Sequence, residues 1–418
     1  MKKITGTLLL FALMLTFLGA SAQDTPKDYR TYPHWIDMMQ DPEANFFETQ
    51  KAFNEYFEGR EMTKGSGYKL FKRWEYWMEK QVPPEGRKPS PYRDLETIKA
   101  LRSGSRSSIM GEWVSLGPST VPSGYNGYRG LGRVNAVGFH PTDVNTIYIG
   151  APSGGLWLTH DGGATWESHT DILPTLGISA VIVDYVNPDV VYVGTGDRDA
   201  GDAPGAGVWK SYDGGITFEP ANVGMEQGVI SRLMIHPTIN NIIIAATGSG
   251  IYRSENSGTT WTKSVSGNFK DVVFKPGNPD VVYAASSGRF YRSVDNAVTF
   301  EEVTNGLTGG YRGAIAVSPE DPAVVYFLVT NSESFKGLYL STNSGLTFNL
   351  QSTSPNIMSW NCNGGTGGQA WYDLDIACDP TNADIIYAGG VNCFKSSNAG
   401  LTWSINSHWW GDCGVPSV

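Results

Sequence analysis

The chain has 418 residues and a formal net charge of −10, from 31 basic and 41 acidic side chains. This length is enough for a large hydrophobic core and for more than one domain. Because a nucleic-acid-binding protein needs a basic face, the acidic balance argues against nucleic acid as a partner. Only 17% of the residues are charged and 50 are glycine, which we interpret as an all-β protein with many tight turns.

Residues 1–22 have the pattern of a secretion signal. Two lysines precede an apolar run at residues 8–18, and Ala-Ser-Ala follows at residues 20–22. We therefore expect cleavage after this tripeptide. No later stretch is long and apolar enough to span a bilayer. The sequence thus predicts a mature chain that is secreted or carried on the cell surface, with no membrane span.

Residues 23–81 have a helical periodicity that differs from the rest of the chain. Asp41-Pro42 is a plausible helix start, and aromatic residues recur after it at helical spacing. A second helix is expected over residues 68–79. One interpretation is a small helical hairpin that buries an aromatic stripe against itself or against the following domain. The other is a pro-segment that occludes a site. The proline-rich residues 82–111 are predicted to be a linker.

One octapeptide organises the remainder of the sequence, because it occurs six times. The first copy is THDGGATW at residues 159–166, and the pattern is Ser/Thr-x-Asp/Asn-x-Gly-x-Thr-Trp/Phe. Successive copies lie 39 to 55 residues apart, a period that suits the blades of a β-propeller. The side chains at the third position, to which we assign a structural role, are Asp161, Asp213, Asn256, Asp295, Asn343 and Asn398.

The octapeptide is interpreted as a hairpin turn. Its Asp or Asn side chain can accept hydrogen bonds from backbone amides just downstream, and its glycine can adopt a positive φ without steric cost. The threonine returns the chain to a strand, and the Trp or Phe supplies a large apolar group. The fourth copy has Ala297 in place of the glycine. If that position is left-handed, the alanine costs on the order of 1 kcal/mol.

Each repeat contains the strands of a complete blade. Two apolar runs precede the octapeptide, a third strand leads into it, and a fourth leaves from its aromatic residue. The apolar runs have no polar face, as expected of strands covered by neighbouring blades. Since four strands per repeat are typical of a propeller, we predict an all-β propeller of six four-stranded blades over residues 112–418, preceded by the small helical segment.

A lone strand, EWVSLG at residues 112–117, precedes the first complete blade. Propellers often close by letting such a strand complete the last blade, but the sixth repeat already has an outgoing strand at residues 403–406. We therefore expect this chain to be the N-terminal part of a longer protein. The alternative is a six-bladed ring with an extra edge strand.

The six octapeptides, together with the stretches NPDVVYVGTGD and GLGRVNAVGFHP, resemble the Asp-box (BNR-like) propellers of the sortilin type. Chains of this style also resemble exported Bacteroidota proteins that use type IX secretion. The resemblance implies that the boxes are structural and lie on the face away from the ligand. Sortilin-type propellers have ten blades and a cysteine-rich module, and type IX substrates have a C-terminal sorting domain. This sequence contains neither a complete set of ten blades nor a sorting domain.

Two long loops are the candidate ligand sites. The glycine-rich loop at residues 194–207 carries Asp197, Asp199 and Asp202, and clustered carboxylates can bind Ca²⁺ or act as acid and base. The alternative is a solvated turn with acidic caps, since the order of a known calcium loop is absent. We predict no cofactor, with Ca²⁺ as the alternative.

The second long loop, at residues 349–372, carries Trp360 and Trp371. These aromatic side chains could stack on a sugar or a peptide, or they could pack beside a disulfide. In an exported protein the four clustered cysteines predict two disulfides, with three possible pairings. Their spacings are longer than those of zinc ligands, so we predict no metal. The candidate disulfide residues are Cys362, Cys378, Cys393 and Cys413.

Two classes of function fit such a propeller. Sialidases and xyloglucanases also carry Asp boxes, and the resemblance to xyloglucanases implies a catalytic Asp in the first blade. The aligned residue here is Pro152, which removes a group that a glycosidase needs. We therefore predict a binding module for peptide, glycan or another surface protein, with a purely structural stalk as a further reading. The alternative is a glycoside hydrolase of the sialidase or xyloglucanase type, in which Asp197, Asp199 or Asp202 would be the catalytic carboxylate.

Overall fold

The computed structural model describes residues 33–41, 43–89, 132–409 and 413–416. The predicted secretion signal at residues 1–22 and the predicted lone strand at residues 112–117 lie outside these ranges, as does most of the predicted linker.

The described residues after residue 132 form six antiparallel sheets of four strands each, which confirms the predicted fold class. In every sheet the strands lie side by side in the order of the sequence. Blade 1 contains β1 (Ala136–Phe139), β2 (Ile147–Ala151), β3 (Gly155–Thr159) and β4 (Glu167–Ser168); blade 2, β5 (Ile178–Val183), β6 (Val191–Thr195), β7 (Val208–Ser211) and β8 (Glu219–Pro220); blade 3, β9 (Ile230–Ile235), β10 (Ile243–Thr247), β11 (Gly250–Ser254) and β12 (Thr262–Ser266); blade 4, β13 (Phe269–Phe274), β14 (Val282–Ser286), β15 (Arg289–Ser293) and β16 (Glu301–Val303); blade 5, β17 (Arg312–Val317), β18 (Val325–Thr330), β19 (Phe335–Ser341) and β20 (Asn349–Ser352); and blade 6, β21 (Asp375–Asp379), β22 (Asn382–Gly389), β23 (Cys393–Ser396) and β24 (Ser404–Ser407).

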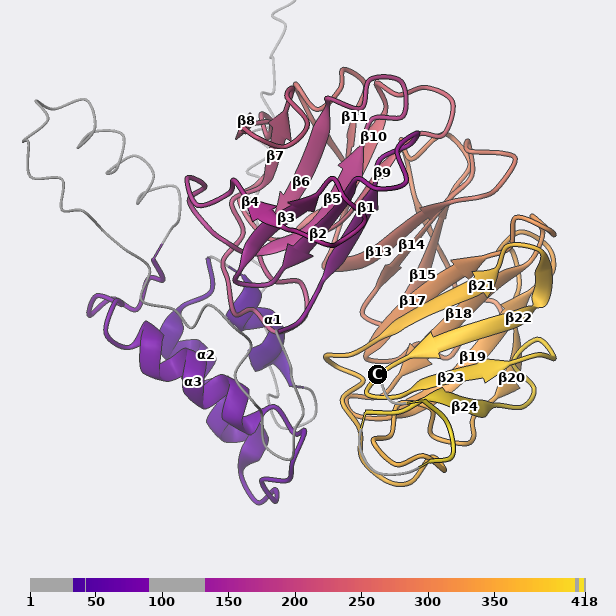
Figure 1. The fold of residues 1–418 in the computed structure, drawn as a ribbon. Helices are drawn as coiled ribbons and strands as arrows, with labels where there is room; N and C mark the ends of the chain where they lie inside the picture. Colours follow the sequence, from indigo (N-terminus) through magenta and orange to yellow (C-terminus); the bar gives the residue numbers. More distant parts are fainter. Residues whose placement is uncertain (1–32, 42, 90–131, 410–412, 417–418) are drawn as a thin grey trace, which may run out of the picture.

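The first strand of each blade faces the centre of the molecule. β1 contacts β5, β5 contacts β9, β9 contacts β13, β13 contacts β17, and β17 contacts β21. The six sheets therefore follow one another around a common centre, and their succession can be followed by the strand labels in Figure 1. Arg133, before β1, lies over the ring of Tyr372, before β21, with its guanidinium carbon 4.5 Å from the ring centre. This contact joins the first and last blades.

In three blades the second strand carries a tyrosine that ties the blade to the next one. Tyr148, Tyr192 and Tyr326 are almost fully buried, and a buried hydroxyl needs a hydrogen-bond partner. Each of the three donates to a backbone carbonyl of the following blade. The acceptors are Gly214 at 2.9 Å, Ser257 at 3.1 Å and Ala383 at 2.8 Å, respectively. These bonds fix the spacing of neighbouring blades.

All six octapeptides form the turn between the third and fourth strands of a blade. In the first copy, Asp161 accepts hydrogen bonds from the backbone and the hydroxyl of Thr165, at 2.9 and 2.7 Å. The hydroxyl of Thr159 donates to the same carboxylate and accepts from the amide of Gly163. Ala297 has a φ of 61° and is therefore left-handed, so the fourth copy does carry the strain expected of alanine there.

Within the described residues, three helices precede the blades: α1 (His34–Gln40), α2 (Phe46–Phe57) and α3 (Tyr68–Met78). The predicted helix start at Asp41-Pro42 is wrong, because Asn45 caps α2 by accepting from the amides of Phe47 and Glu48. Asp41 instead follows the end of α1. α1 extends to Gln40, so Asp41 follows its last turn and the next helix begins only at Phe46.

The helices bury an aromatic core that also contacts the propeller. The rings of Phe53 and Phe71 are stacked with their centres 3.7 Å apart, and Trp35 lies edge-on to both. The ring of Trp35 is also 6.4 Å from that of Trp371, in the loop before β21. The aromatic stripe is thus buried both within the segment and against the propeller. That this segment is a removable pro-segment stays a prediction.

Of the two predicted disulfides, the structure forms only the one between Cys362 and Cys413, whose Cα atoms are 5.9 Å apart. Cys378 and Cys393 are free thiols in the described part of the chain. They lie on β21 and β23, with β22 between them. Two strand spacings are roughly 9.5 Å, beyond the reach of about 7 Å that a disulfide allows between Cα atoms.

Candidate functional site

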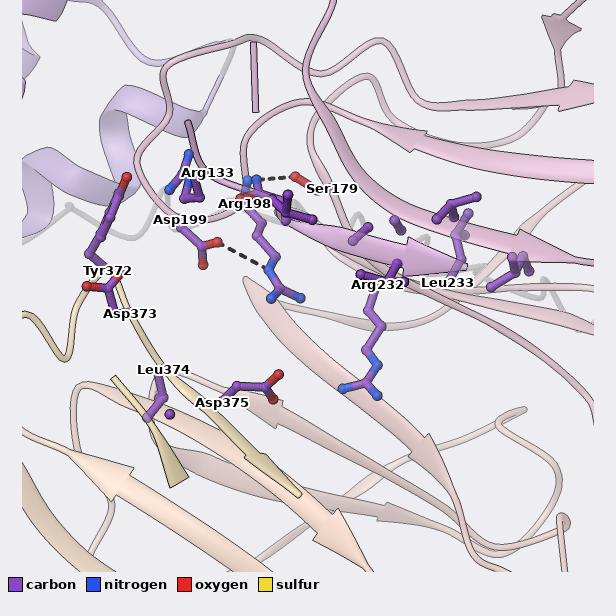
Figure 2. Close-up of a pocket in the computed structure, with 18 of the residues that line it drawn as sticks. Arg133, Ser179, Arg198, Asp199, Arg232, Leu233, Tyr372, Asp373, Leu374 and Asp375 are labelled. Atoms are coloured by element: carbon purple, nitrogen blue, oxygen red, sulfur yellow. Dashed lines mark hydrogen bonds and ion pairs between the residues drawn. The ribbon is translucent and has the colours of Figure 1, made fainter. Parts of the chain in front are cut away.

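A cavity of about 640 Å³ lies at the centre of the propeller. Its walls come from β1, β5, β9 and β21, from the segments before β1 and β21, and from the loop after β6, so residues far apart in sequence meet there (Figure 2). Charged residues occur at or near the start of several first strands, and these starts share one end of the channel. The charged side chains that line the cavity are Arg133, Arg198, Arg232, Asp199, Asp373 and Asp375.

Asp197 organises the loop after β6 rather than facing a ligand. Its side chain is fully buried. One carboxylate oxygen lies 2.7 Å from Nη2 of Arg133. The carboxylate also accepts hydrogen bonds from the backbone amides of Asp199, Ala200 and Asp202, at 3.1–3.2 Å. Its oxygens are therefore already occupied by the loop and by one ion pair.

Asp199 is held by two arginines. Arg312 of β17 donates to Oδ1 at 2.6 Å, and Arg198 donates to Oδ2 at 3.3 Å. Burial alone would raise the pKa of Asp199, but the positive charges of Arg312, Arg198 and Arg133 keep this pKa below its usual value. Asp199 therefore stays ionised and fixes the arginine side chains around the cavity.

Asp373 has the opposite electrostatic environment. Burial raises the pKa of its carboxyl group to about 6, and the negative charge of Asp199 acts in the same direction. Arg312 and Arg133 oppose the shift without cancelling it. The pKa of Asp199 is thus lowered and the pKa of Asp373 is raised, although both line the same cavity. Such a separation of pKa values is typical of an acid–base site. Asp375, two residues further on, is exposed and also lines the cavity.

The helical segment covers one rim of the channel. Gln40, at the end of α1, donates to the carbonyl of Arg198 at 2.9 Å. Lys270 donates to the same carbonyl at 2.6 Å and also contacts Gln40. Burial lowers the pKa of Lys270 to about 8, with Asp37 of α1 opposing the shift. Asp37 in turn accepts from Asn268 at 3.1 Å. α1 therefore fixes the loop that carries two of the cavity residues.

A second cavity, of about 530 Å³, lies between α1 and blade 3. Its titratable lining residues are all acidic: Asp37, Asp41, Glu43 and Glu226. In the part of the chain that the structure describes, no group of three His, Cys, Asp or Glu side chains is arranged to hold a metal ion. Nor does any described helix have the length and apolar character needed to cross a bilayer.

The sequence-predicted site residues fall in three different environments. Asp197 and Asp199 are buried and ion-paired, and only Asp199 lines the central cavity, while Asp202 is exposed on the loop. Trp371 is 6% exposed and donates from Nε1 to the carbonyl of Gly65 at 2.9 Å. It therefore belongs to the interface with the helical segment and has no free face for a ligand.

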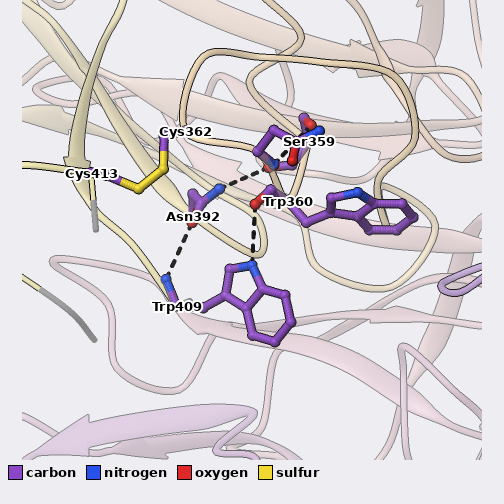
Figure 3. The surroundings of a disulfide bond; sticks show 7 residues. Ser359, Trp360, Cys362, Asn392, Trp409 and Cys413 are labelled. Carbon is purple, nitrogen blue, oxygen red and sulfur yellow. Dashed lines mark hydrogen bonds between the residues drawn. A yellow bond between two sulfur atoms is a disulfide. The ribbon is translucent and has the colours of Figure 1, made fainter. Parts of the chain in front are cut away.

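Trp360 lies two residues before Cys362 of the disulfide, and its indole ring points away from that bond, as Figure 3 shows. Its carbonyl accepts a hydrogen bond from Nε1 of Trp409 at 3.2 Å. Asn392 links the same two segments, because it donates to the carbonyl of Ser359 and accepts from the amide of Trp409. These hydrogen bonds hold the region together, and the role of the half-buried Trp360 in ligand binding stays a prediction.

The sequence analysis missed Arg133, Arg232, Asp373 and Asp375. A signal for them exists in the repeats, because the first apolar run of a blade begins with or contains a charged residue in several copies. The sequences RVNAVGF, ISRLMI and YDLDIAC are examples. A charge at the start of an otherwise apolar inner strand indicates a side chain that faces the channel rather than a neighbouring blade.

No protein-family model matches the sequence. The chain is 26% identical over 349 residues to xyloglucanase Xgh74A of Acetivibrio thermocellus, a match that covers 68% of this chain and 39% of that protein. It is 27% identical over 184 residues to a xyloglucanase of a Paenibacillus species, covering 40% of this chain and 18% of that enzyme. The chain therefore spans about two fifths of the length of the first of these relatives.

Solved structures of GH74 enzymes share the fold. The Niastella koreensis GH74 enzyme superimposes with a TM-score of 0.52 and 19% identity, over 65% of this chain and 46% of that one. An ancestral GH74 enzyme gives the same TM-score and identity over 67% of this chain and 39% of the other. The propeller is thus similar to those of GH74 enzymes. The resemblance to sortilin-type propellers and to type IX substrates stays a prediction.

These similarities contradict the predicted function as a binding module, because the relatives are xyloglucanases. The prediction rested on Pro152, which takes the place of the catalytic Asp expected by resemblance. In the structure Pro152 lies between β2 and β3. Pro152 is only one position, and blade 6 brings the carboxylates of Asp373 and Asp375 to the central cavity.

Proposed function

We propose that this chain is a glycoside hydrolase whose active site is the central cavity of the propeller. The observation that carries the proposal is the presence of Asp373 and Asp375 in one open cavity of a chain that is similar to xyloglucanases. Glycosidases use two carboxyl groups that flank the scissile bond. Pro152 cannot serve, so the acid and the base must come from other residues.

In this proposal Asp373 is the general acid. With a pKa raised to about 6 by burial, this carboxyl group is half protonated at pH 6 and still about one-tenth protonated at pH 7, whereas an ordinary aspartate is almost fully ionised at both pH values. The proton passes to the glycosidic oxygen as the bond between that oxygen and the anomeric carbon breaks. Asp375 accepts a proton from the water that attacks the anomeric carbon, so the products are two sugars and Asp373 is left ionised.

Asp199 and its arginines support this chemistry without taking part in it. Because Asp199 is ionised and buried near Asp373, its charge favours the protonated form of Asp373. Tyr372 lies beside the acid under the guanidinium of Arg133, and burial raises the pKa of its hydroxyl to about 12. This tyrosine therefore remains a neutral hydrogen-bond donor across the working pH range.

A polysaccharide substrate would meet this protein outside the cell. The secretion-signal pattern at residues 1–22 supports export as part of the same proposal.

The experiment is a survey of polysaccharides, including xyloglucan, with release of reducing ends as the measurement. We expect hydrolysis by the full chain and a loss of kcat of about 10²–10⁴-fold in the Asp373→Asn variant. Asp384→Asn, an exposed aspartate of β22 in the same blade, is the matched control and should retain full activity. Full activity of Asp373→Asn would contradict the assignment.

A further inference from the structure

Arg133 has two buried donor groups without a partner. Its Nη2 faces Asp197, and its plane lies over Tyr372. Nε and Nη1 are buried and have no hydrogen-bond partner among the described residues. A buried donor that lost its water and gained no acceptor is costly, and the cost is greater for a charged group. The side chain is held in place on two sides and lines the central cavity on the third.

An unpaired buried acceptor, Oδ1 of Asn135, lies two residues after Arg133 in the segment before β1. Asn135 donates from Nδ2 to Asp197 at 3.2 Å, while its Oδ1 is buried and unpaired among the residues that the structure describes. Asn135 also lines the cavity. Arg133 and Asn135 are two residues apart, so one wall of the cavity offers unpaired guanidinium donors next to an unpaired amide acceptor.

Two further arginines line the cavity, and each is paired with an aspartate: Arg198 with Asp199, and Arg232 with Asp271. Arg198 and Arg232 project into the cavity, as Figure 2 shows. Of the acidic groups near Arg133, Asp197 forms an ion pair with its Nη2 and Asp199 is engaged by other arginines. Asp199 is bonded to Arg312 and Arg198. Asp197 pairs with Nη2 of Arg133 and leaves its buried Nε and Nη1 groups without an acceptor among the described residues.

We propose that the central cavity binds an anionic glycan, with a uronate carboxylate held by the Nε and Nη1 groups of Arg133 and a neighbouring sugar hydroxyl donating to Oδ1 of Asn135. This inference rests on the proposed function, since it names the substrate class of the same cavity. A planar guanidinium matches a carboxylate with two parallel hydrogen bonds, and such charge-assisted bonds are about twice as strong as neutral ones. A neutral sugar hydroxyl supplies only the weaker kind.

The bound carboxylate would also assist the acid. A substrate carboxylate bound to Arg133 would lie on the side of the cavity that holds Asp373. A nearby negative charge disfavours ionisation of a carboxyl group. An anionic substrate therefore keeps Asp373 protonated until the proton is transferred. The net charge of the whole chain is −10, which disfavours non-specific binding of polyanions. Binding of an acidic oligosaccharide thus reports on the local arginines.

The test is calorimetric binding of three tetrasaccharides to the full chain. The probes are a β-1,4-linked glucuronate tetramer, cellotetraose, and 6-O-sulfated cellotetraose, which differ only at C6 as carboxylate, hydroxymethyl and sulfate ester. We expect the glucuronate tetramer to bind at least about tenfold more tightly than either of the others. Tighter binding of the sulfated probe, or equal binding of all three, would overturn the inference.

Two substitutions locate the effect. Arg133→Gln and Arg133→Lys should each weaken binding of the glucuronate tetramer about tenfold or more and leave cellotetraose within about twofold. The lysine variant keeps a positive charge opposite Asp197, so it guards against misfolding, and thermal unfolding of both variants is measured. Arg289→Gln, an exposed arginine of β15, is the control and should bind as the wild type does. A loss of affinity for both sugars alike would contradict the assignment.

The outcome separates this inference from the proposed function. Tight binding of the glucuronate tetramer with no cleavage of any glycan supports the anionic site and contradicts hydrolysis. Hydrolysis of neutral polysaccharide without any preference for glucuronate supports hydrolysis and contradicts the anionic site.

Discussion

The Asp373→Asn substitution is predicted to stabilise the protein at neutral pH while it removes activity. In the folded protein, burial raises the pKa of Asp373 to about 6, whereas an aspartate in an unfolded chain titrates near pH 3.9. The folded state therefore binds the proton more tightly than the unfolded state does. This preference stabilises the fold fully below about pH 4 and is lost as the pH rises through 6.

The size of the effect follows from the two pKa values. They differ by about two units, and each unit corresponds to about 1.4 kcal/mol, so ionisation of Asp373 costs the wild type about 3 kcal/mol of unfolding free energy above pH 7. An asparagine cannot ionise and escapes this cost. Relative to the wild type, the variant should therefore gain about 3 kcal/mol between pH 4 and pH 7.5.

The assay is denaturant-induced unfolding of both proteins at pH 4.0, 5.5 and 7.5. Asp384→Asn serves as the control because that side chain is exposed on β22, and its difference from the wild type should not vary with pH in this way. A free-energy difference between Asp373→Asn and the wild type that is constant across this range, or that falls as the pH rises, would refute the electrostatic account of the cavity.

Three further predictions concern the fold and are measured by equilibrium unfolding. Gly214→Ala should lower the free energy of unfolding by about 1 kcal/mol, because the φ of Gly214 is 72° and its surroundings are open. Gly400→Ala should lower it by about 2–4 kcal/mol, since the new methyl group would also overlap a leucine of blade 5. Equal costs would contradict the packing of the turn at Gly400. Cys362→Ser should remove about 4 kcal/mol, because the disulfide spans 51 residues, and Cys378→Ser, which changes a free thiol, should cost less than about 1 kcal/mol. A reducing agent that destabilises the Cys362 variant further would show a second disulfide. Trp35→Ala should cost about 3–5 kcal/mol, since this side chain is fully buried between the helices and the propeller; a cost below 1 kcal/mol would show that the helical segment is not docked.

The propeller could be predicted because its determinants are local. Each octapeptide contains its own hydrogen-bond acceptor, its own left-handed residues and its own strand-starting threonine, so the turn can be recognised without knowing what lies beside it. The left-handed φ of Ala297 illustrates the point, since the position alone indicated the conformation.

The disulfides could be predicted only in part, because pairing depends on distances across a sheet. The clustering of four cysteines indicated disulfides, and Cys362 does pair with Cys413. Cys378 and Cys393 lie on strands separated by a third strand, and this separation is set by the order of strands in blade 6. Sequence spacing of 15 residues contains no information on that order.

The candidate site was the least predictable part. Loop length and acidity drew attention to residues 194–207, and of the three aspartates there only Asp199 reaches the cavity wall. Asp373 lies one residue beyond the second long loop, and Arg133 lies before the first blade. These residues come together only because the first strands of blades 1, 2, 3 and 6 share one channel. Their burial and charge, which set the pKa of Asp373, exist only in the folded protein.

The most direct test of the account is a crystal structure of the Asp373→Asn variant with a bound oligosaccharide substrate. The account predicts the sugar in the central cavity, with a glycosidic oxygen within hydrogen-bond distance of the side chain at position 373 and a water molecule or sugar carbon facing Asp375. An oligosaccharide bound instead in the acidic cavity between α1 and blade 3, with the central cavity empty, would contradict the claim that the channel of the propeller is the active site.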